Sequence, residues 1–371
     1  MKLLIDAHVF DEKFQGTRTY LKGLYSALIP YAEDWEFYFV ANDIENLERE
    51  FGAASNVYFL KFSSQNKYYR LLIDLPQIIK ENKIDYAHYQ YISPFIKNCK
   101  NIVTTHDILF NEDRFKKYFP LKYRLVNNFL FKRSAKNANL LLTVSQYSKK
   151  KISINYNIPL EKIIVTPNAI SNDFNENIDS QVVKKNYGID KYILYVSRIE
   201  PRKNHLVLLK AYNELKLYDE GYQLVFIGVE DIVTDELNSY KLAHKKDLNS
   251  NVHWLSGVPY NELKSFYKSC DLFVFPSFAE GFGIPPLEAI SMGKKVICSN
   301  TTALNDFDFP DDMSFDPFNL EELKMKIIRA LETDSSNIIE VKRNLLEKYN
   351  WESIAKEFYS LFFEKIKENN V

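Results

Sequence analysis

Two glutamates stand on either side of a turn rich in glycine and proline, with seven residues between them, in the segment from Glu280 to Glu288 that reads EGFGIPPLE. A carboxylate only accepts hydrogen bonds, so two of them beside exposed backbone N–H groups suit a ligand with both hydroxyls and phosphate oxygens. Either glutamate alone could be an ordinary turn or helix residue. Their combination with Gly281, Gly283 and the double proline favours a binding site.

The flanking residues predict how this turn is positioned. Leu272 to Phe275 is a short apolar run typical of a strand buried on both faces of a parallel sheet. Chemistry in such sheets lies at the carboxyl ends of the strands. Pro285 and Pro286 suit the first turn of a helix. We therefore expect Glu280 just past the strand and Glu288 near the start of that helix.

A cluster of cations follows a second apolar strand, Tyr192 to Val196, in the segment SRIEPRKN. We expect a helix to begin near Pro201, with Arg202 and Lys203 in its first turn. The helix dipole disfavours cations there unless an anion is bound. Arg198 offers a planar fork and Lys203 a point charge, a pair suited to a diphosphate that gains negative charge. The alternative is a solvated charged turn.

The first half of the chain offers weaker candidates. The strand IVTTHD places His106 and Asp107 just beyond a sheet edge, and the segment FQGTRTYLKGL places Gly16 ahead of a helix. A lone histidine after a strand is more often structural than functional. His106 is nevertheless the strongest histidine candidate, and His8, also just past a strand, is a weaker one.

Length and composition indicate a two-domain protein of ordinary globular type. The chain has 371 residues, 46% of them hydrophobic and 15% aromatic, with a net charge of -1. Such a length exceeds one compact core, and such a charge does not indicate a nucleic-acid binder. Cys99, Cys270 and Cys298 lack zinc-ligand spacing, and reduced thiols fit a cytoplasmic location. No segment resembles a secretory signal or a membrane span.

Strand patterns alternate with helix patterns, which predicts an α/β protein with parallel sheets. The polar, turn-rich stretch from Pro167 to Gly188 predicts the domain boundary. We expect domains at 1–170 and 171–350. An amphipathic helix should cover 351–371 and bury its apolar face.

With these residues assembled, the chain resembles the retaining glycosyltransferases of family 4, also called group 1. The resemblance spans nearly the whole chain and is carried by EGFGIPPLEAISMGKKVICSN, with SRIEPRKN, TPNA, TVSQYSKK and THD in support. It implies the GT-B fold, with two Rossmann-like parallel-sheet domains facing a cleft. The first domain would bind the acceptor and the second the nucleotide sugar, and the last helix would pack back on the first domain.

The resemblance also implies roles for the donor-side residues. Arg198 and Lys203 would bind the donor diphosphate, and Glu288 would hold the nucleotide ribose. Glu280 would hold the hydroxyls of the transferred sugar, together with the backbone amides of Phe282, Gly283 and Ile284. On the acceptor side, His106 would face the sugar, and Gly16 would lie near the diphosphate and acceptor. Many relatives carry paired glycines where this chain has Gln15 and Gly16.

The expected reaction transfers a hexose with retention at the anomeric carbon, with no cofactor beyond the nucleotide sugar. GDP-mannose is the favoured donor and a UDP-sugar the main alternative. The acceptor would be a glycan or a lipid-linked sugar in bacterial surface polysaccharide or lipopolysaccharide synthesis. No metal is predicted, because Asp306 and Asp308 belong to an acidic loop far from any nucleotide-binding strand pattern.

The positive charge is concentrated in the first half. Up to Ile170 there are 24 basic and 17 acidic residues, and from Arg114 to Leu160 there is no Asp or Glu. This pattern suggests peripheral binding to the inner face of the cytoplasmic membrane through residues 114–160. The alternative is a solubilising helix face.

Other function classes share parts of this pattern. A nicotinamide or flavin oxidoreductase would share α/β domains, but the G-x-G-x-x-G fingerprint is absent, since Pro286 stands where its last glycine should follow Gly281 and Gly283. A sugar-nucleotide epimerase or a non-catalytic nucleotide-sugar-binding subunit of the same fold stays open.

Overall fold

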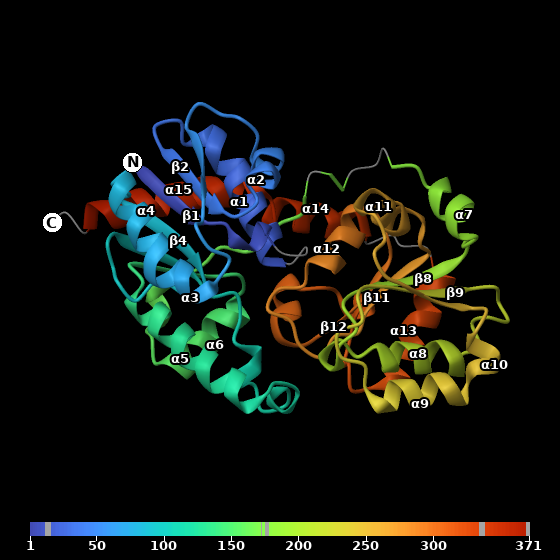
Figure 1. The fold of residues 1–371 in the computed structure, drawn as a ribbon. Coiled ribbons are helices and arrows are strands. Elements are labelled where there is room, and N and C mark those ends of the chain that lie inside the picture. The colour runs from blue at the N-terminus through green and yellow to red at the C-terminus, as the bar shows by residue number, and fades with distance from the viewer. Residues whose placement is uncertain (12–15, 172, 175–177, 334–337, 369–371) are drawn as a thin grey trace. The chain divides into compact units, whose positions relative to one another are not determined.

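The computed structural model describes residues 1–11, 16–171, 173–174, 178–333 and 338–368. The chain divides into two compact units. Unit 1 consists of Met1–Ala169 and Tyr349–Val371, and unit 2 of Ile170–Lys348. Each unit is built around one parallel sheet with helices on its faces (Figure 1).

The sheet of unit 1 has seven strands among the described residues, in the order β3-β2-β1-β4-β5-β6-β7. All its neighbouring strands pair in parallel. The strands are β1 (Lys2–Asp6), β2 (Glu36–Ala41), β3 (Val57–Lys61), β4 (Tyr86–Gln90), β5 (Lys100–Thr104), β6 (Leu140–Thr143) and β7 (Ile163–Val165).

The helices of unit 1 connect these strands. They are α1 (Gly16–Tyr31), α2 (Ile44–Phe51), α3 (Lys67–Tyr69), the π-helix η2 (Arg70–Asp74), α4 (Leu75–Asn82), α5 (Leu121–Asn137), α6 (Gln146–Tyr156) and α15 (Trp351–Glu368). Short 3-10 turns are η1 (His8–Phe10), η3 (Leu109–Asn111), η4 (Lys116–Tyr118) and η5 (Leu160–Lys162).

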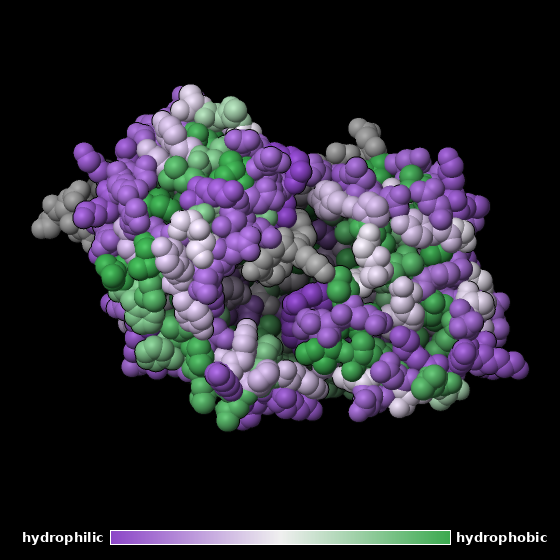
Figure 2. Space-filling model, viewed as in Figure 1, coloured by the Kyte–Doolittle hydropathy of each residue, from purple (hydrophilic) through white to green (hydrophobic). Residues whose placement is uncertain are grey.

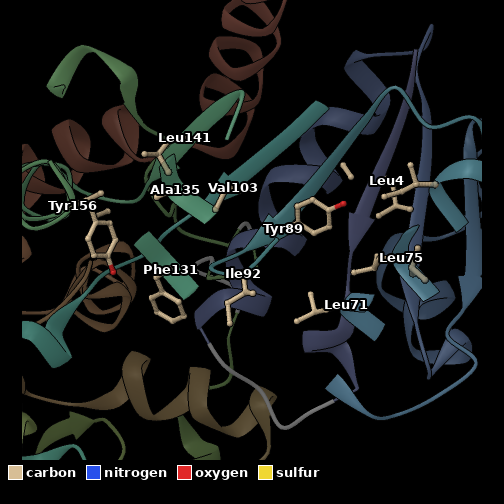
Figure 3. Close-up of a cluster of buried hydrophobic side chains, with 14 of the residues drawn as sticks. Leu4, Leu71, Leu75, Tyr89, Ile92, Val103, Phe131, Ala135, Leu141 and Tyr156 are labelled. Atoms are coloured by element: carbon tan, nitrogen blue, oxygen red, sulfur yellow. The ribbon is translucent and has the colours of Figure 1, made fainter. Parts of the chain in front are cut away.

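Alternation along the strands divides the core of unit 1 into two layers. On one face, Leu4, Tyr89 and Val103 belong to a buried cluster (Figure 3). Leu75 of α4 and Phe131 of α5 join the same cluster. Successive side chains of a strand point to opposite faces, so the neighbouring strand residues face the layer of α1 and α15. Both faces are covered, which explains the continuous apolar runs that the sequence shows.

The last helix packs on the first, as the sequence predicted. α15 lies against α1 within unit 1. A Cβ placed on Gly23 of α1 would lie 2.0 Å from the Trp351 ring, so only glycine allows this approach. Trp35 and Phe362 extend the contact, with ring centroids 4.9 Å apart. The expected return of the C-terminal helix to the first domain is therefore confirmed.

The sheet of unit 2 has six strands among the described residues, in the order β10-β9-β8-β11-β12-β13, all parallel. They are β8 (Tyr192–Val196), β9 (Gln223–Ile227), β10 (Val252–Leu255), β11 (Leu272–Phe275), β12 (Val296–Ser299) and β13 (Ser314–Phe315). The two-residue strand β13 was not predicted, because two residues carry no periodicity.

The helices of unit 2 are α7 (Gln181–Tyr187), α8 (His205–Glu214), α9 (Asp235–Ala243), α10 (Lys245–Leu248), α11 (Tyr260–Ser269), α12 (Ile284–Ser291), α13 (Leu320–Glu332) and α14 (Ile338–Lys348). Its 3-10 turns are η6 (Pro201–Lys203), η7 (Thr302–Phe307) and η8 (Asp311–Met313). The parallel sheets and the returning helix confirm the predicted fold class.

Replacing Gly23 with alanine should destabilise the protein by about 1 to 3 kcal/mol, because the new methyl overlaps the Trp351 ring. Denaturant unfolding measures this, with exposed Ser26→Ala on the same helix as a control. In a Trp351→Leu background the loss should shrink or change sign, since alanine is otherwise better than glycine in a helix. An equal loss in both backgrounds would contradict this account.

Candidate functional site

Glu280 is the central residue of the candidate site in unit 2. It follows β11 and is only 6% exposed. Its carboxylate accepts hydrogen bonds from Lys203 Nζ at 2.6 Å and from Arg202 Nη1 at 3.1 Å. Its backbone N–H donates to Thr302 Oγ1 at 2.9 Å. The carboxylate is thus fixed from both its side chain and its backbone.

The two cations determine the charge of Glu280. Burial alone would raise the pKa of its carboxyl, but Lys203 and Arg202 outweigh burial and lower that pKa to about 2. Burial and Arg202 lower the pKa of Lys203, and Glu280 opposes that change. Glu280 is therefore ionised at neutral pH and can only accept hydrogen bonds.

The cations sit in a separate turn before the helix, which corrects our prediction. Arg202 and Lys203 end the 3-10 turn η6, and α8 begins only at His205. Asn204 breaks the helix because its backbone is left-handed, with φ 53° and ψ 42°. The first turn of α8 thus does not contain them, and the dipole argument does not apply to these residues.

Neighbouring elements hold this turn in place. The hydroxyl of Tyr195, in β8, donates to the carbonyl oxygen of Lys203 at 2.7 Å. The backbone N–H of Phe278, in the loop after β11, donates to the carbonyl oxygen of Arg202 at 2.8 Å. The loops that follow β8 and β11 therefore form one hydrogen-bonded structure at the carboxyl end of the sheet.

Arg198 and Lys203, predicted to act together, are linked through a chain of alternating charges. Arg198 is exposed and pairs with Asp231 at 3.1 Å. Glu200 Oε1 lies 3.7 Å from Arg198 and 2.7 Å from Arg202, which in turn contacts Glu280. Spacing alone gives no role to Arg202 or Glu200, and the charge run in SRIEPRKN is the signal that points to them.

The glycine-containing loop is shaped for close backbone approach. Gly283 has φ 99°, and a Cβ there would lie 2.5 Å from the Leu304 side chain. Phe282 is buried and meets the Phe307 ring edge to face, with centroids 5.4 Å apart. Ile284 begins α12 and is followed by two prolines. Since proline has no N–H, Ile284 carries the only amide N–H of the first three helical positions.

Glu288 occupies a less polar environment than Glu280. It lies in the middle of α12 and not near its start, which corrects our prediction, because the helix begins at Ile284 and ends at Ser291. Its Oε2 accepts a hydrogen bond from the Tyr267 hydroxyl at 2.6 Å. Burial raises the pKa of Glu288 to about 7, and the Tyr267 bond acts in the opposite direction. Tyr267 comes from α11 and was not predicted, because no motif marks it.

The predicted histidine lies in unit 1, in a buried polar chain. His106 follows β5, is 6% exposed and donates from Nε2 to Gln90 Oε1 at 2.7 Å. Gln90 Nε2 lies 3.3 Å from Nε2 of His88, which also contacts Tyr25. Burial lowers the pKa of His106 to about 3. His106 is therefore neutral, and its Nδ1 is a hydrogen-bond acceptor.

The remaining candidates of unit 1 lie at the start of α1 and just past β1. Gly16 is the first residue of α1, and a Cβ there would have no heavy atom of the described residues within 4 Å. Gln15 lies outside the described residues. His8 Nδ1 lies 2.9 Å from Oδ1 of the buried Asp6, whose Oδ2 is 3.7 Å from Arg70 Nε. The ring of His8 is thus oriented by a carboxylate.

In the part of the chain that the structure describes, no group of three or more His, Cys, Asp and Glu residues could hold a metal ion. Asp308 is highly exposed and lies 3.7 Å from Lys348. The cysteines Cys99, Cys270 and Cys298 are unpaired thiols. No helix within the described ranges has both the length and the apolar character needed to cross a membrane.

The contact between Lys203 and Glu280 should show strong coupling in a double-mutant cycle. We expect Lys203→Met alone to cost several kcal/mol of unfolding free energy, up to about 3 to 5, because it leaves a buried carboxylate with one cation fewer. Adding Glu280→Gln should recover much of that loss. The exposed Lys184–Asp190 pair, at 2.7 Å, is the matched control and should couple by less than about 1 kcal/mol. Equal coupling in the two cycles would contradict this electrostatic assignment.

The chain is similar in sequence to several known proteins. The chain is 32% identical over 231 residues to O-antigen chain mannosyltransferase B of Escherichia coli, which covers 60% of each chain. It is 32% identical over 213 residues to O-antigen chain mannosyltransferase RfbU of Salmonella typhimurium, covering 56% of this chain and 53% of that one. The aligned region thus spans little more than half of each of these relatives.

Among solved structures, Anabaena HepE in complex with UDP and glucose superposes with a TM-score of 0.73. The two are 17% identical, and the match covers 98% of this chain and 100% of HepE. The family model Glycosyltransferase Family 4 matches residues 15–174, and the model Glycosyl transferases group 1 matches residues 177–349. The chain has the GT-B fold and belongs to glycosyltransferase family 4, the group 1 glycosyl transferases.

Proposed function

We propose that this chain is a retaining glycosyltransferase that moves a hexose from a nucleotide diphosphate sugar to an acceptor hydroxyl. The observation that carries the proposal is the buried, ionised Glu280 held by Lys203 and Arg202 at the carboxyl end of the unit 2 sheet. A carboxylate there accepts from sugar hydroxyls, and the adjacent cations attract the diphosphate. Both halves of a nucleotide sugar thus find complementary groups within one small region.

The reaction requires stabilisation of the leaving diphosphate. As the bond to the sugar breaks, negative charge grows on the phosphate oxygens, and Lys203 and Arg198 supply positive charge without rearranging the fold. Glu280 is engaged by two cations, which makes it a poor nucleophile. We therefore propose a same-face displacement in which the departing phosphate takes the acceptor proton, while the protein supplies orientation and electrostatics.

The other candidates take binding roles. Glu288 holds the nucleotide ribose, and the amides of Phe282, Gly283 and Ile284 hold the transferred sugar. Gly16, at the start of α1, is assigned to the diphosphate and the acceptor, as the family resemblance implies. His106 is neutral and accepts through Nδ1 from a sugar hydroxyl. It is therefore a binding group and not an acid or base near neutral pH, since its pKa of about 3 lies far below that range.

The proposed donor is GDP-mannose, and the acceptor is a glycan or a lipid-linked sugar of a bacterial surface polysaccharide. Support comes from the relatives named O-antigen mannosyltransferases. A UDP-sugar is the alternative donor, supported by the structural likeness to HepE, which was solved with UDP and glucose. The proposed location is cytoplasmic. Unit 1, by its place in the family fold, is the proposed acceptor-binding domain.

A membrane surface is a further proposed partner, and α5 carries the argument. Leu121, Leu125 and Phe129 follow one another at helical spacing and are 63%, 62% and 63% exposed. Hydrophobic side chains lie on the visible surface over this helix (Figure 2). Residues 114–160 contain lysines and arginines but no acidic residue. An exposed apolar stripe within a basic segment suits an anionic lipid surface.

Thermal unfolding against nucleotides tests the donor. We expect one nucleoside diphosphate sugar, with GDP-mannose favoured over UDP-glucose, to stabilise the protein by roughly 2.7 kcal/mol at 100 times its dissociation constant. Arg198→Ala should weaken this shift, whereas Lys184→Ala, which removes an exposed cation elsewhere in unit 2, should not. A shift with NAD alone, or none with either nucleotide sugar, would overturn the proposal.

Product analysis separates transferase activity from the alternatives. A glycosyltransferase releases nucleoside diphosphate only in proportion to a glycosylated acceptor. An epimerase converts the nucleotide sugar without any acceptor, and a binding subunit leaves it unchanged.

Vesicle cosedimentation tests the membrane. We expect binding to anionic vesicles that weakens with added salt, and little binding to neutral ones. Phe129→Glu should reduce it by roughly tenfold or more, because it replaces apolar area with a repelled charge. Leu242→Glu, at a 73% exposed leucine of unit 2, is the matched control. Equal binding to anionic and neutral vesicles would rule out the charge-based mechanism.

A further inference from the structure

We infer that Tyr267 is a positioning residue of the donor site, whose hydroxyl orients Glu288 and favours the ionised carboxylate that accepts from the two hydroxyls of the nucleotide ribose. The inference rests on the proposed function, which assigns the ribose to Glu288. Tyr267 belongs to no motif that carries the family resemblance.

The geometry fixes the tyrosine and, through it, the carboxylate. Tyr267 is 0% exposed. Its ring packs against Phe273 of β11, with centroids 5.5 Å apart, and against Phe174 at 5.6 Å. Its hydroxyl donates to Oε2 of Glu288 at 2.6 Å. Because the ring cannot swing away, one carboxylate oxygen is held by protein, and Oε1 keeps its lone pairs for a ligand.

The chemistry of a ribose makes the charge of Glu288 decisive. A neighbouring pair of hydroxyls can donate two hydrogen bonds to an ionised carboxylate. A protonated carboxyl must instead donate one bond itself, so it matches this pair poorly. Burial raises the pKa of Glu288 to about 7, and the Tyr267 bond restrains that rise. Donor binding should therefore weaken as pH falls through about 7.

The surroundings offer Glu288 no other charge partner among the described residues. α12 packs against α11, α14, β11 and β12. α11 contributes Tyr267, and burial and this tyrosine are the causes of the shifted pKa of Glu288. The other titratable groups on these elements are not among the causes of the shift in the pKa of Glu288. They are Tyr260, Glu262, Lys264 and Lys268 of α11, Cys298 of β12, and Glu340, Lys342, Arg343, Glu347 and Lys348 of α14.

Glu280 does not contribute to the expected pH dependence of donor binding. The pKa of Glu280 lies at about 2, so Glu280 stays ionised throughout the neutral range. The pKa of His106, at about 3, also lies below that range. The diphosphate of an intact nucleotide sugar is fully ionised there as well. A change in donor affinity around neutral pH that is lost in Glu288→Gln therefore reports on Glu288.

The test measures the dissociation constant of GDP-mannose or UDP-glucose, whichever binds, by calorimetry from about pH 6 to about pH 8.5. Below the pKa, affinity should fall up to roughly tenfold per pH unit. Tyr267→Phe keeps the ring but removes the hydroxyl, so the midpoint should move to higher pH and affinity at pH 7 should drop several-fold. At the highest pH the variant should recover. Glu288→Gln should show weak binding without this dependence.

Tyr187→Phe is the matched control, because the Tyr187 hydroxyl donates to Glu262 in the same unit. It should behave like wild type.

A second measurement needs no ligand. Because folding raises the pKa of Glu288 from 4.5 to about 7, the folded chain holds an extra proton between these values, and its stability falls as pH rises through them. The melting temperature of Glu288→Gln should therefore decrease less than that of the wild type as pH rises through this range.

Two results would overturn the inference: an unchanged midpoint in Tyr267→Phe, or wild-type affinity that does not vary with pH. In either case the wild type still binds the nucleotide sugar, so the proposed function stands. Failure of the wild type to bind either nucleotide sugar at any pH would instead overturn the proposed function, and the inference with it.

Discussion

A buried carboxylate that must remain ionised constrains the structure of unit 2 around it. Glu280 is 6% exposed, and its charge is compatible with that burial because Lys203 and Arg202 contact it directly. Those cations can reach it only if their turn stays against the loop after β11, which is what the Phe278 to Arg202 hydrogen bond achieves. Removing one of the three side chains would leave a buried charge without a partner, and its desolvation would destabilise the folded state. The site is therefore also a structural element of its unit.

Two residues of the same type acquire different properties from their surroundings. Glu280 meets two cations and has a pKa of about 2, whereas Glu288 meets one tyrosine hydroxyl and has a pKa of about 7. Their spacing puts one in the loop and the other in the middle of α12. The loop after β11 lies against the turn after β8, which carries Arg202 and Lys203. The helix position faces α11, which supplies only Tyr267.

The sequence predicts the strands well, and also the position of the site residues relative to those strands, because both depend on local pattern. The apolar runs Tyr192–Val196 and Leu272–Phe275 form β8 and β11 with the predicted bounds, and the residues after β11 fall at the carboxyl end of the sheet as expected. It predicts side-chain partners poorly. The left-handed Asn204 separated the cations from α8, and neither the Arg202 contact with Glu280 nor the Tyr267 contact with Glu288 follows from spacing. These contacts join segments that are far apart in the sequence, and local periodicity carries no information about such contacts.

Unit 1 shows a related limit on what residue type alone reveals. A histidine after a strand can be structural or functional, and the contacts of His106 decide its protonation: it is buried and its Nε2–H is donated to Gln90, which leaves a neutral ring. The neighbouring His88 is 0% exposed and bonded to Tyr25 and Thr104. Such a chain fixes tautomers, because each member needs a donor or an acceptor from the next. His106 thus presents a fixed lone pair, a property useful for orienting a hydroxyl. Proton transfer would require it to gain a charge that its surroundings do not stabilise.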